Sequence, residues 1–392
     1  MKHQQHKKKK IVVVSTFSGM DLFMLGLVYS GMLPGYAIER NIYAALMHAD
    51  NFRNPDGSSV IEFVDISQDE FERRKKYQDQ KGKRTLEDTC IKKDGRYLRA
   101  KEIHEVSGKE IREDLERKYG KDLIIILIGG PPCQDFTKLN SKKKTGNGSR
   151  NYLVFEYLRI LDELEPDIGI MEEVPELKTQ EFEDIYEAFI KQALTMPYMI
   201  AEQEMRSIHY GGNQNRERIF ILFVHKKLGV DPEFPEADEV NVKRVRDFLD
   251  IDYFCHGIYN YSLKDKNHFM PTVTSSNPTA FFKDDQKYQP PIDDLLLCFD
   301  VGKGIYTIPE GIPQVQIRKA IGNAVCVSVS KAFAKIITEK ILRVRPLDNG
   351  YWISIDDNDD LYNNLEWNHE GEINPEGSVI VTDEDVDELF EV

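Results

Sequence analysis

The alternation of short apolar runs with longer amphipathic segments over the first 225 residues is the feature that most restricts the fold. Runs suited to buried strands occur at 11–14, 36–39, 60–66, 123–130, 167–174 and 218–224. Segments of helical character separate them, near 21–31, from Ile42 onward, at 151–164 and at 180–195. Strands that alternate with helices in this way predict a parallel sheet with helices on both faces. We therefore expect an α/β protein built on a Rossmann-like, doubly wound and mostly parallel sheet.

Changes in composition along the chain divide it into distinct parts. A strongly charged stretch at 68–121 interrupts the strand–helix rhythm, and its simplest interpretation is a surface insertion with a solvated helical face. The rhythm fades after residue 225 into sequence rich in Tyr, Asn, Asp and Pro, which is typical of a small, loop-rich domain. A helix-like segment at 319–342 then resumes the first pattern. We expect a large domain at 11–225 and 317–345, a small domain at 226–316 and a C-terminal extension at 346–392.

Negative charge is concentrated in that C-terminal extension. The whole chain has a net charge of -15, from 67 acidic and 52 basic residues. The extension holds 15 of the acids and no Lys or Arg, so the rest of the chain has 52 residues of each sign. A neutral body can still carry a basic cleft that attracts phosphates, because local fields steer charged ligands. The acidic balance therefore does not exclude a nucleic-acid enzyme, and we expect the extension to aid solubility.

Several classes of protein are disfavoured by what the sequence lacks. No run of about 18 apolar residues suggests a membrane span, and the basic start is followed by an apolar stretch too short for a signal peptide. The five cysteines show no CxxC spacing, so neither a disulfide framework nor a zinc site is expected. These features predict a soluble cytoplasmic protein, of bacterial, archaeal or viral origin, without a bound metal.

Cys133 lies where chemistry is expected in such a sheet. It follows the apolar run at 123–130, and ligands bind beyond the carboxyl ends of strands in open α/β sheets. A thiolate can add to an electron-poor ring, although a lone cysteine is more often buried and inert. Gly19 suits a turn at which backbone approaches a ligand, and Glu39 can bind ribose hydroxyls. These two residues would equally suit a nicotinamide cofactor or an ordinary turn.

Five motifs in a fixed order make the chain resemble the cytosine-5 DNA methyltransferase family. Pro-Pro-Cys-Gln followed by Phe136 is similar to the family's catalytic loop, and FSGMD at 17–21 is similar to its cofactor loop. EEV at 172–174, QNRER at 214–218 and IGNAV at 321–325 resemble its Glu-Asn-Val, Gln-x-Arg-x-Arg and final motifs. The resemblance implies a class I methyltransferase fold, a target-recognition role for the small domain, and S-adenosyl-L-methionine as cofactor.

The resemblance also implies a mechanism. Cys133 would add to carbon 6 of cytosine and so make carbon 5 nucleophilic, with Glu172 as general acid at ring nitrogen 3. A strand-end Glu that caps the next helix is the simpler alternative for Glu172. Arg216 and Arg218 alternate with Glu217, so both point to one face of a strand. By the resemblance, they would hold the cytosine oxygen and fix the catalytic loop and Glu172. The alternative is that they form ion pairs at the surface. The base must be flipped out of the duplex, at a cost of about a few kcal/mol.

Two further sets of residues follow from the resemblance and from local composition. By the resemblance, the cofactor would be bound by Phe17, Gly19, Glu39, Arg40, Asp65, Ile66, Pro132, Leu153, Asn323 and Val325. The lysines after the nucleophile lie among small flexible residues and suit a mobile lid over DNA phosphates, with a solvated lysine run as the alternative. The expected DNA contacts are Gln134, Lys138, Lys142, Lys143, Lys144, Arg150 and Gln214.

The chain departs from the family pattern at a few positions. Glu173 replaces the usual Asn, which puts two acids side by side. Only one of them can face the cytosine, because strand neighbours point to opposite faces, and the alignment favours Glu172. Asp21 replaces a common Gly, and the family's Leu-Thr-x-Arg-Glu segment is not recognisable between 300 and 318.

Double-stranded DNA is the expected partner, with two alternatives. Relatives that act on transfer RNA share Pro-Pro-Cys-Gln and a Phe-Thr pair like Phe136 and Thr137, and their Cys-Phe-Thr is matched in part by Cys298 and Phe299 before Asp300. A catalytically silent DNA-binding regulator is the other alternative, and the retained catalytic residues argue against it. The favoured interpretation is a monomeric modification enzyme, with or without a cognate restriction endonuclease, whose target sequence depends on loops of the small domain.

Overall fold

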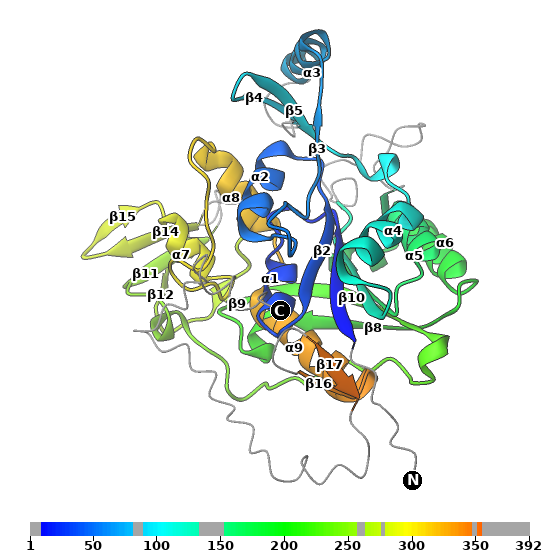
Figure 1. The fold of residues 1–392 in the computed structure, drawn as a ribbon. Coiled ribbons are helices and arrows are strands. Elements are labelled where there is room, and N and C mark those ends of the chain that lie inside the picture. Colours follow the sequence, from blue (N-terminus) through cyan, green and yellow to red (C-terminus); the bar gives the residue numbers. More distant parts are fainter. Residues whose placement is uncertain are drawn as a thin grey trace.

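A central sheet of six strands forms the body of the protein (Figure 1). The computed structural model describes residues 9–80, 89–132, 153–256, 263–275, 279–346 and 351–354. In spatial order the strands are β2 (Leu33–Ile38), β1 (Lys10–Thr16), β6 (Leu123–Gly129), β7 (Ile168–Glu173), β10 (Glu217–His225) and β8 (Tyr198–Arg206). The first four run parallel, whereas β10 is antiparallel to both of its neighbours. The expected α/β fold with a mostly parallel sheet is confirmed.

Apolar side chains on both faces of β1 explain its position inside the sheet. Ile11 and Val13 belong to the core on one face, and Val12 and Val14 belong to the core on the other. All four are fully buried. Burial of one such side chain contributes about 1.5–3 kcal/mol. A continuous apolar run is therefore typical of a strand in a sheet that is covered on both sides.

Helices provide that cover (Figure 1). One layer contains α1 (Leu22–Val28), α2 (Ile42–Asn51), α8 (Gln314–Asn323) and α9 (Val327–Ile336), and the other contains α4 (Gly108–Tyr119), α5 (Leu153–Leu164) and α6 (Glu183–Ala193). α4 begins with a capping box between Ser107 and Glu110. Its buried Ile111 and Leu115 lie one turn apart and pack in the α5 layer. The last part of the charged stretch at 68–121 is therefore integral to a helical layer.

The earlier part of that stretch forms an arm that projects from the body, at the top of Figure 1. Here β3 (Phe63–Asp65), β5 (Arg96–Ala100) and β4 (Cys90–Lys93) make a separate antiparallel sheet beside α3 (Gln68–Gln80). The run at 60–66 was expected to be a buried strand of the central sheet, and this was wrong. Ile61 makes a single bridge to Ala37, after which the chain leaves the body and pairs with β5 instead.

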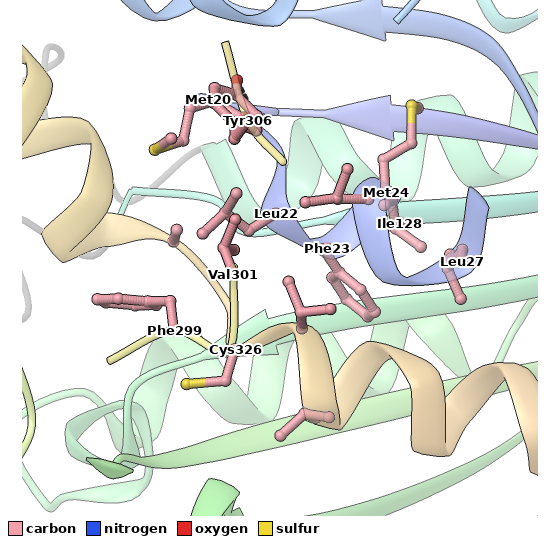
Figure 2. Packing of buried hydrophobic residues seen from close by; sticks show 14 of the residues in the cluster. Met20, Leu22, Phe23, Met24, Leu27, Ile128, Phe299, Val301, Tyr306 and Cys326 are labelled. Atoms are coloured by element: carbon pink, nitrogen blue, oxygen red, sulfur yellow. Dashed lines mark hydrogen bonds between the residues drawn. The ribbon is translucent and has the colours of Figure 1, made fainter. Parts of the chain in front are cut away.

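Close packing joins α1 to α9 (Figure 2). A Cβ atom on Gly26 would lie 1.8 Å from Ser330 Oγ, so only glycine fits there. The ring of Phe23 lies 6.1 Å from that of Phe220 and 6.2 Å from that of Phe333, measured between centroids. Nearby, the Tyr306 hydroxyl donates a hydrogen bond to Met20 O at 2.5 Å. These contacts hold the loop before α1 against the segment that leads to α8.

The single helix expected at 319–342 is two helices. α8 ends at Asn323, Ala324 and Cys326 are extended, and α9 begins at Val327 and runs into the π-helical turn Ile337–Ile341. Val327 N donates to Phe299 O at 3.1 Å, so a tertiary contact replaces helical bonding at the break. The apolar periodicity continues across the break, which is why the sequence did not reveal it.

The segment Gln314–Ile341 is long and apolar enough to cross a membrane if judged by length and composition alone. However, 67% of its most apolar window is buried inside the protein. The segment packs with its neighbours α1 and α2, so it is a core element of the fold.

A second, smaller sheet lies to one side of the body, at the left of Figure 1. Its order is β12 (Lys264–Asp265), β11 (Tyr253–His256), β14 (Thr279–Lys283) and β15 (Gln286–Tyr288). Phe254 and Phe281 are buried in the same core cluster as α1 and α9. The short pair of β13 (Met270–Pro271) with β9 (Gln214–Asn215) and the helix α7 (Ile292–Leu297) connect this part to the body.

Trp352 anchors the hairpin of β16 (Val344–Pro346) and β17 (Trp352–Ser354) on the body. Its side chain is 3% exposed, and its indole N–H donates to Gly31 O at 3.3 Å. Its backbone exchanges hydrogen bonds of 2.7 and 2.9 Å with Lys9. The first residues of the acidic extension are therefore part of the folded body.

We expect Trp352→Ala to lower the free energy of unfolding by about 3–5 kcal/mol, the usual cost of truncating a buried Trp or Phe. Guanidinium denaturation followed by circular dichroism measures this change. Leu194→Ala is the control, because Leu194 is 64% exposed and its loss should change stability by less than about 0.5 kcal/mol. Equal, small changes in both variants would show that the hairpin does not anchor the chain end.

Candidate active site

A crevice forms at the carboxyl ends of β1 and β6. The chain continues from β1 to its neighbour β2 on one side and from β6 to its neighbour β7 on the other side. β1 lies between β2 and β6, and Thr16 pairs with Gly129 at the carboxyl ends of β1 and β6. The loops that follow these two strands diverge, and in open α/β sheets ligands bind in the resulting crevice. A cavity of about 730 Å³ lies there. This volume is typical of a site for a small molecule or cofactor.

The walls of the cavity come from elements that are far apart in the sequence. The loops after β1, β2 and β6 contribute residues 17–20, 39–41 and 130–132, and β7 contributes Glu172 and Glu173. The other lining residues include Glu102, Ile103 and His104 at the 3-10 helix Ile103–Glu105, Leu153, Arg216, Arg218, Gln316, Lys319 and Asn323. A smaller adjoining cavity of about 50 Å³ is lined by Asn323 and Val325 among others.

The loop after β1 has an unusual backbone. Phe17, Gly19 and Asp21 have positive φ values of 54°, 59° and 61°. Glycine adopts this conformation freely, but Phe17 and Asp21 do so at a cost of about 1–2 kcal/mol each. Asp21 compensates by capping α1, because its carboxylate accepts a hydrogen bond from Met24 N at 3.0 Å and lies 3.2 Å from His48 Nε2. The acid in the family's Gly position therefore has a structural role.

Glu39 joins two walls of the cavity. Its carboxylate accepts hydrogen bonds from Gly19 N at 2.7 Å and from Asn41 N at 2.6 Å. Asn41 in turn caps α2 by accepting bonds from the first amides of that helix. Glu39 thus fixes the loop after β1 relative to the start of α2, at the end of the second strand where a ribose-binding acid is expected.

Glu172 and Arg218 form an ion pair at the edge of the cavity. Arg218 Nε lies 2.8 Å from Glu172 Oε1, and both side chains are largely buried. The pairing follows from topology: β10 is antiparallel to β7, so its first residues lie beside the last residues of β7, with Phe220 opposite Glu172. A Cβ atom on Gly130 would lie 3.0 Å from Glu172 Oε2. Glu172 therefore lies beside the loop that leads to Cys133.

Arg216 connects the body to the segment after β13 and to α8. It is 3% exposed, and its Nη1 donates to Val273 O and to Gly322 O, each at 3.2 Å. Its guanidinium carbon lies 5.5 Å from the centre of the Phe299 ring. The approach of the two bonded segments is close, because a Cβ atom on Gly322 would lie 2.2 Å from Ser275 N. Arg216 thus lines the cavity and fixes the position of its walls.

Glu173 is buried deeply at the same end of β7. It is 1% exposed, and its Oε2 accepts a hydrogen bond from Val174 N at 3.1 Å. Oε1 has no hydrogen-bond partner among the described residues. Burial, and then the neighbouring charge of Glu172, raise the pKa of Glu173 well above its ordinary value. Its environment therefore favours the protonated form of the acid in the usual Asn position.

Most of the residues expected to bind the cofactor or the cytosine meet at this cavity. Those that line it are Phe17, Gly19, Glu39, Arg40, Pro132, Leu153, Glu172, Arg216, Arg218 and Asn323. Cys133, Gln134, Lys138, Lys142, Lys143, Lys144 and Arg150 lie outside the described residues. Pro132, directly before Cys133 in the sequence, is part of the wall.

Three residues lie elsewhere. Asp65, expected at the adenine edge, is exposed on the arm and pairs with Arg96, which lowers the pKa of Asp65. Ile66 follows it, and its N–H donates to Tyr97 O at 2.9 Å. Gln214, expected to contact DNA, is fully buried: its Nε2 donates to Cys298 O at 2.7 Å and its Oε1 accepts from Val273 N at 2.9 Å. The amide of Gln214 serves packing between segments, which corrects the expectation.

Three residues that line the cavity, Glu102, His104 and Lys319, were not predicted from the sequence. Glu102 lies 3.7 Å from Arg40 Nε and 3.4 Å from Arg74 Nη1, so it links the arm helix α3 to the loop after β2. His104 and Lys319 line the cavity from two other elements. No motif marks these positions, because they meet only through tertiary folding. Within the described ranges, no group of three or more His, Cys, Asp or Glu side chains is arranged to hold a metal ion.

Comparison with known proteins identifies relatives of the chain. Residues 93–281 match the family described as C-5 cytosine-specific DNA methylase. The type II methylase M.HgiDII of Herpetosiphon aurantiacus is 33% identical over 149 residues, which are 38% of this chain and 40% of the relative. The type II methyltransferase M.FnuDI of Fusobacterium nucleatum is 32% identical over 128 residues, 32% of this chain and 36% of the relative. The chain thus matches less than half the length of these two relatives.

Solved structures share the fold. A Spodoptera frugiperda DNMT2 mutant aligns with a TM-score of 0.54 and 15% identity, over 84% of this chain and 99% of that chain. The Entamoeba histolytica methyltransferase EhMeth aligns with a TM-score of 0.53 and 17% identity, over 84% and 98%. The sheet and its crevice therefore have the fold of class I methyltransferases. Over residues 93–281 the chain matches the C-5 cytosine-specific DNA methylase family, whose members take their methyl group from S-adenosylmethionine. This match is to the same family that the motifs predicted.

Removal of Arg218 tests the ion pair at the cavity edge. We expect Arg218→Met to cost about 3–5 kcal/mol of stability, because it leaves the buried Glu172 carboxylate without its cation. The double variant Arg218→Met/Glu172→Gln should recover most of this loss in a urea-denaturation cycle.

Arg206→Met is the matched control, because it breaks the exposed pair with Glu217. It should cost less than about 1 kcal/mol. If Arg218→Met proved as mild as Arg206→Met, or if Glu172→Gln gave no recovery, Arg218 would not be what compensates the charge of Glu172.

Proposed function

We propose that this protein transfers a methyl group from S-adenosyl-L-methionine to carbon 5 of a flipped cytosine in duplex DNA. The observation that carries the proposal is the position of the Glu172–Arg218 pair in the wall that also contains Pro132. Pro132 is bonded to Cys133, so the nucleophile is one residue from a wall that holds an acid and its cation. The family match supports the same reaction.

The residues of the cavity fit S-adenosyl-L-methionine. Glu39 has the position for ribose hydroxyls, and Arg40 beside it has the position next to the adenine. Phe17, Pro132 and Leu153 offer an apolar wall to the methionine part. Buried polar atoms without partners are rare in proteins, so the unpartnered Oε1 of Glu173 is expected where a ligand completes the site. The cofactor, when bound, supplies the methyl group.

The remaining chemistry belongs to side chains of the protein. The Cys133 thiolate forms a bond to carbon 6 of the cytosine, and the displaced electron pair makes carbon 5 nucleophilic. Glu172 supports this step by sharing a proton with ring nitrogen 3, where negative charge develops. Arg218 holds the Glu172 carboxylate in place, and Arg216 holds the surrounding walls. Solvent then takes the proton from carbon 5, the electron pair of that bond restores the double bond to carbon 6, and the carbon–sulfur bond breaks to release the Cys133 thiolate.

DNA binding falls to two parts of the chain. Lys138, Lys142, Lys143, Lys144 and Arg150 follow the nucleophile in the sequence and suit contacts to phosphates, which give affinity without sequence preference. The domain at 226–316 would read the target bases. The relatives above are named as type II enzymes, which supports a role in DNA modification. The protein would act as a cytoplasmic monomer, either paired with a restriction endonuclease or alone.

Transfer of a labelled methyl group tests this function. We expect incorporation into cytosine-containing duplex DNA and not into transfer RNA. Cys133→Ser should reduce the rate by about 10⁴-fold or more, as is typical when a covalent nucleophile is lost. Cys90→Ser is the control, because Cys90 is buried in the arm away from the cavity, and it should retain activity.

The outcomes separate the possible functions. Covalent trapping on DNA that contains 5-fluorocytosine, with trapping lost in Cys133→Ser, would support the adduct at carbon 6. Methylation of transfer RNA with none of duplex DNA would favour the RNA enzyme. Tight DNA binding with no transfer to either nucleic acid would favour a silent regulator and overturn the proposal.

A further inference from the structure

Four carboxylates line the cavity, and Glu173 differs from the others. Glu39 accepts hydrogen bonds from two backbone amides, Glu102 lies beside Arg40 and Arg74, and Glu172 pairs with Arg218. Glu173 has no cationic partner in the part of the chain that the structure describes, and one of its two oxygens has no hydrogen bond there. It is therefore the lining acid with an unused capacity to balance a positive charge.

The side chain of Glu173 is shielded from solvent. The residue is 1% exposed, and its partner across the strands is Ile219 of β10. The charged or titratable groups that share the cavity or the neighbouring elements are Glu172 on β7, Arg216 and Arg218 at β10, Glu39 and Arg40 after β2, Glu102 and His104 at the 3-10 helix, Lys319 on α8 and the buried Tyr157 on α5. Of these, Glu172 raises the pKa of Glu173 and Arg218 lowers it.

The cofactor carries a positive charge, which is the partner that Glu173 lacks among the described residues. S-adenosyl-L-methionine carries a positive sulfur, and its product after methyl transfer, S-adenosyl-L-homocysteine, has a neutral one. Desolvation of a cation in a cavity of low polarity is costly unless an anion faces it. Glu173 lines the same cavity as Phe17, Pro132 and Leu153, the residues that we place along the methionine part.

We propose that Glu173 provides the negative charge that balances the cationic sulfur of S-adenosyl-L-methionine, and that it gives up its proton to solvent when this cofactor binds. The inference rests on the proposed function, because it needs the cofactor to occupy the cavity. It makes Glu173 a determinant of the choice between cofactor and product. The proton returns to Glu173 once the sulfur is neutral, so S-adenosyl-L-homocysteine gains no such contribution.

A defined dependence on pH follows from the release of a proton. Affinity for S-adenosyl-L-methionine rises with pH up to the pKa of Glu173 in the free protein, because less work is then needed to ionise the acid. Each unit by which the bound cofactor lowers that pKa corresponds to about tenfold in affinity. Affinity for S-adenosyl-L-homocysteine should not follow this trend.

Isothermal titration calorimetry tests the proposal on the full chain without DNA. Titrations with S-adenosyl-L-methionine at pH 7 in phosphate and in Tris, whose ionisation enthalpies differ, report the number of protons released. We expect the wild type to release up to about one proton and Glu173→Gln to release none, because an amide has no proton to lose in this range. Titrations with S-adenosyl-L-homocysteine should show no difference between the two proteins.

Affinity gives a second readout. We expect Glu173→Gln to weaken binding of S-adenosyl-L-methionine about tenfold or more and to change binding of S-adenosyl-L-homocysteine less than about twofold. Glu176→Gln is the matched control, because Glu176 is an exposed acid three residues along the chain and does not line the cavity. It should leave both affinities and the proton count unchanged.

The free energy of unfolding shows whether Glu173→Gln folds, and its dependence on pH reports on the protonation of Glu173. Because the pKa of Glu173 is raised in the folded state, the proton on Glu173 contributes to the stability of the folded protein. This contribution is complete at a pH below the ordinary pKa of 4.5 and is lost as the pH rises through the folded-state pKa. Glu173→Gln should therefore be at least as stable as the wild type at pH 8 in the absence of ligand.

Failure of the proposal and failure of the proposed function give different results. If the wild type binds S-adenosyl-L-methionine but the proton count and the preference over S-adenosyl-L-homocysteine persist in Glu173→Gln, the role of Glu173 is refuted while the function stands. If neither compound binds the wild type, the proposed function itself is refuted.

Discussion

The antiparallel pairing of β10 with β7 is the interaction on which the site depends. In a sheet whose other neighbours run parallel, this one reversed strand brings its first residues to the carboxyl end of β7. Arg218 can then meet Glu172, and Arg216 can reach the segment after β13 and α8. A parallel strand in the same place would present its last residues there, and the two arginines would lie at the opposite edge. The ladder of backbone hydrogen bonds therefore positions the acid and its cation together.

The same arrangement couples the small sheet to the cavity. Arg216 bonds to carbonyls on both sides, Gln214 is fully buried between Cys298 and Val273, and Gly322 allows two backbone segments to touch. Asp300 adds a third connection, because its carboxylate accepts hydrogen bonds from Asn213 N at 2.7 Å and Ser328 N at 3.2 Å. Burial raises the pKa of Asp300. Residues of the Gln-x-Arg-x-Arg and final motifs thus combine packing with their position at the site.

The four carboxylates that line the cavity are stabilised in two different ways. Each of three lining acids has donors or a cation that stabilise its charge, whereas burial and the charge of Glu172 raise the pKa of Glu173 and so favour its protonated form. Two adjacent acids at the end of one buried strand would repel each other if both were ionised, so a proton on one of them is the simplest resolution. This explains how the chain tolerates a second acid where its relatives by motif have an amide.

The sequence by itself determined the strand–helix order, the identity of β1, β6, β7 and β10, and the motif residues at 17–19, 39, 132, 172, 216 and 218 that line the cavity. It did so because apolar runs and motif spacing are local properties that the chain carries without reference to its fold. Tertiary structure alone decided the direction of β10, the break between α8 and α9, and the departure of β3 to the arm with Asp65. It also decided that Gln214 is buried and that Glu102, His104 and Lys319 line the cavity. These features depend on contacts between residues distant in the chain, and no local pattern encodes which distant partner a residue meets.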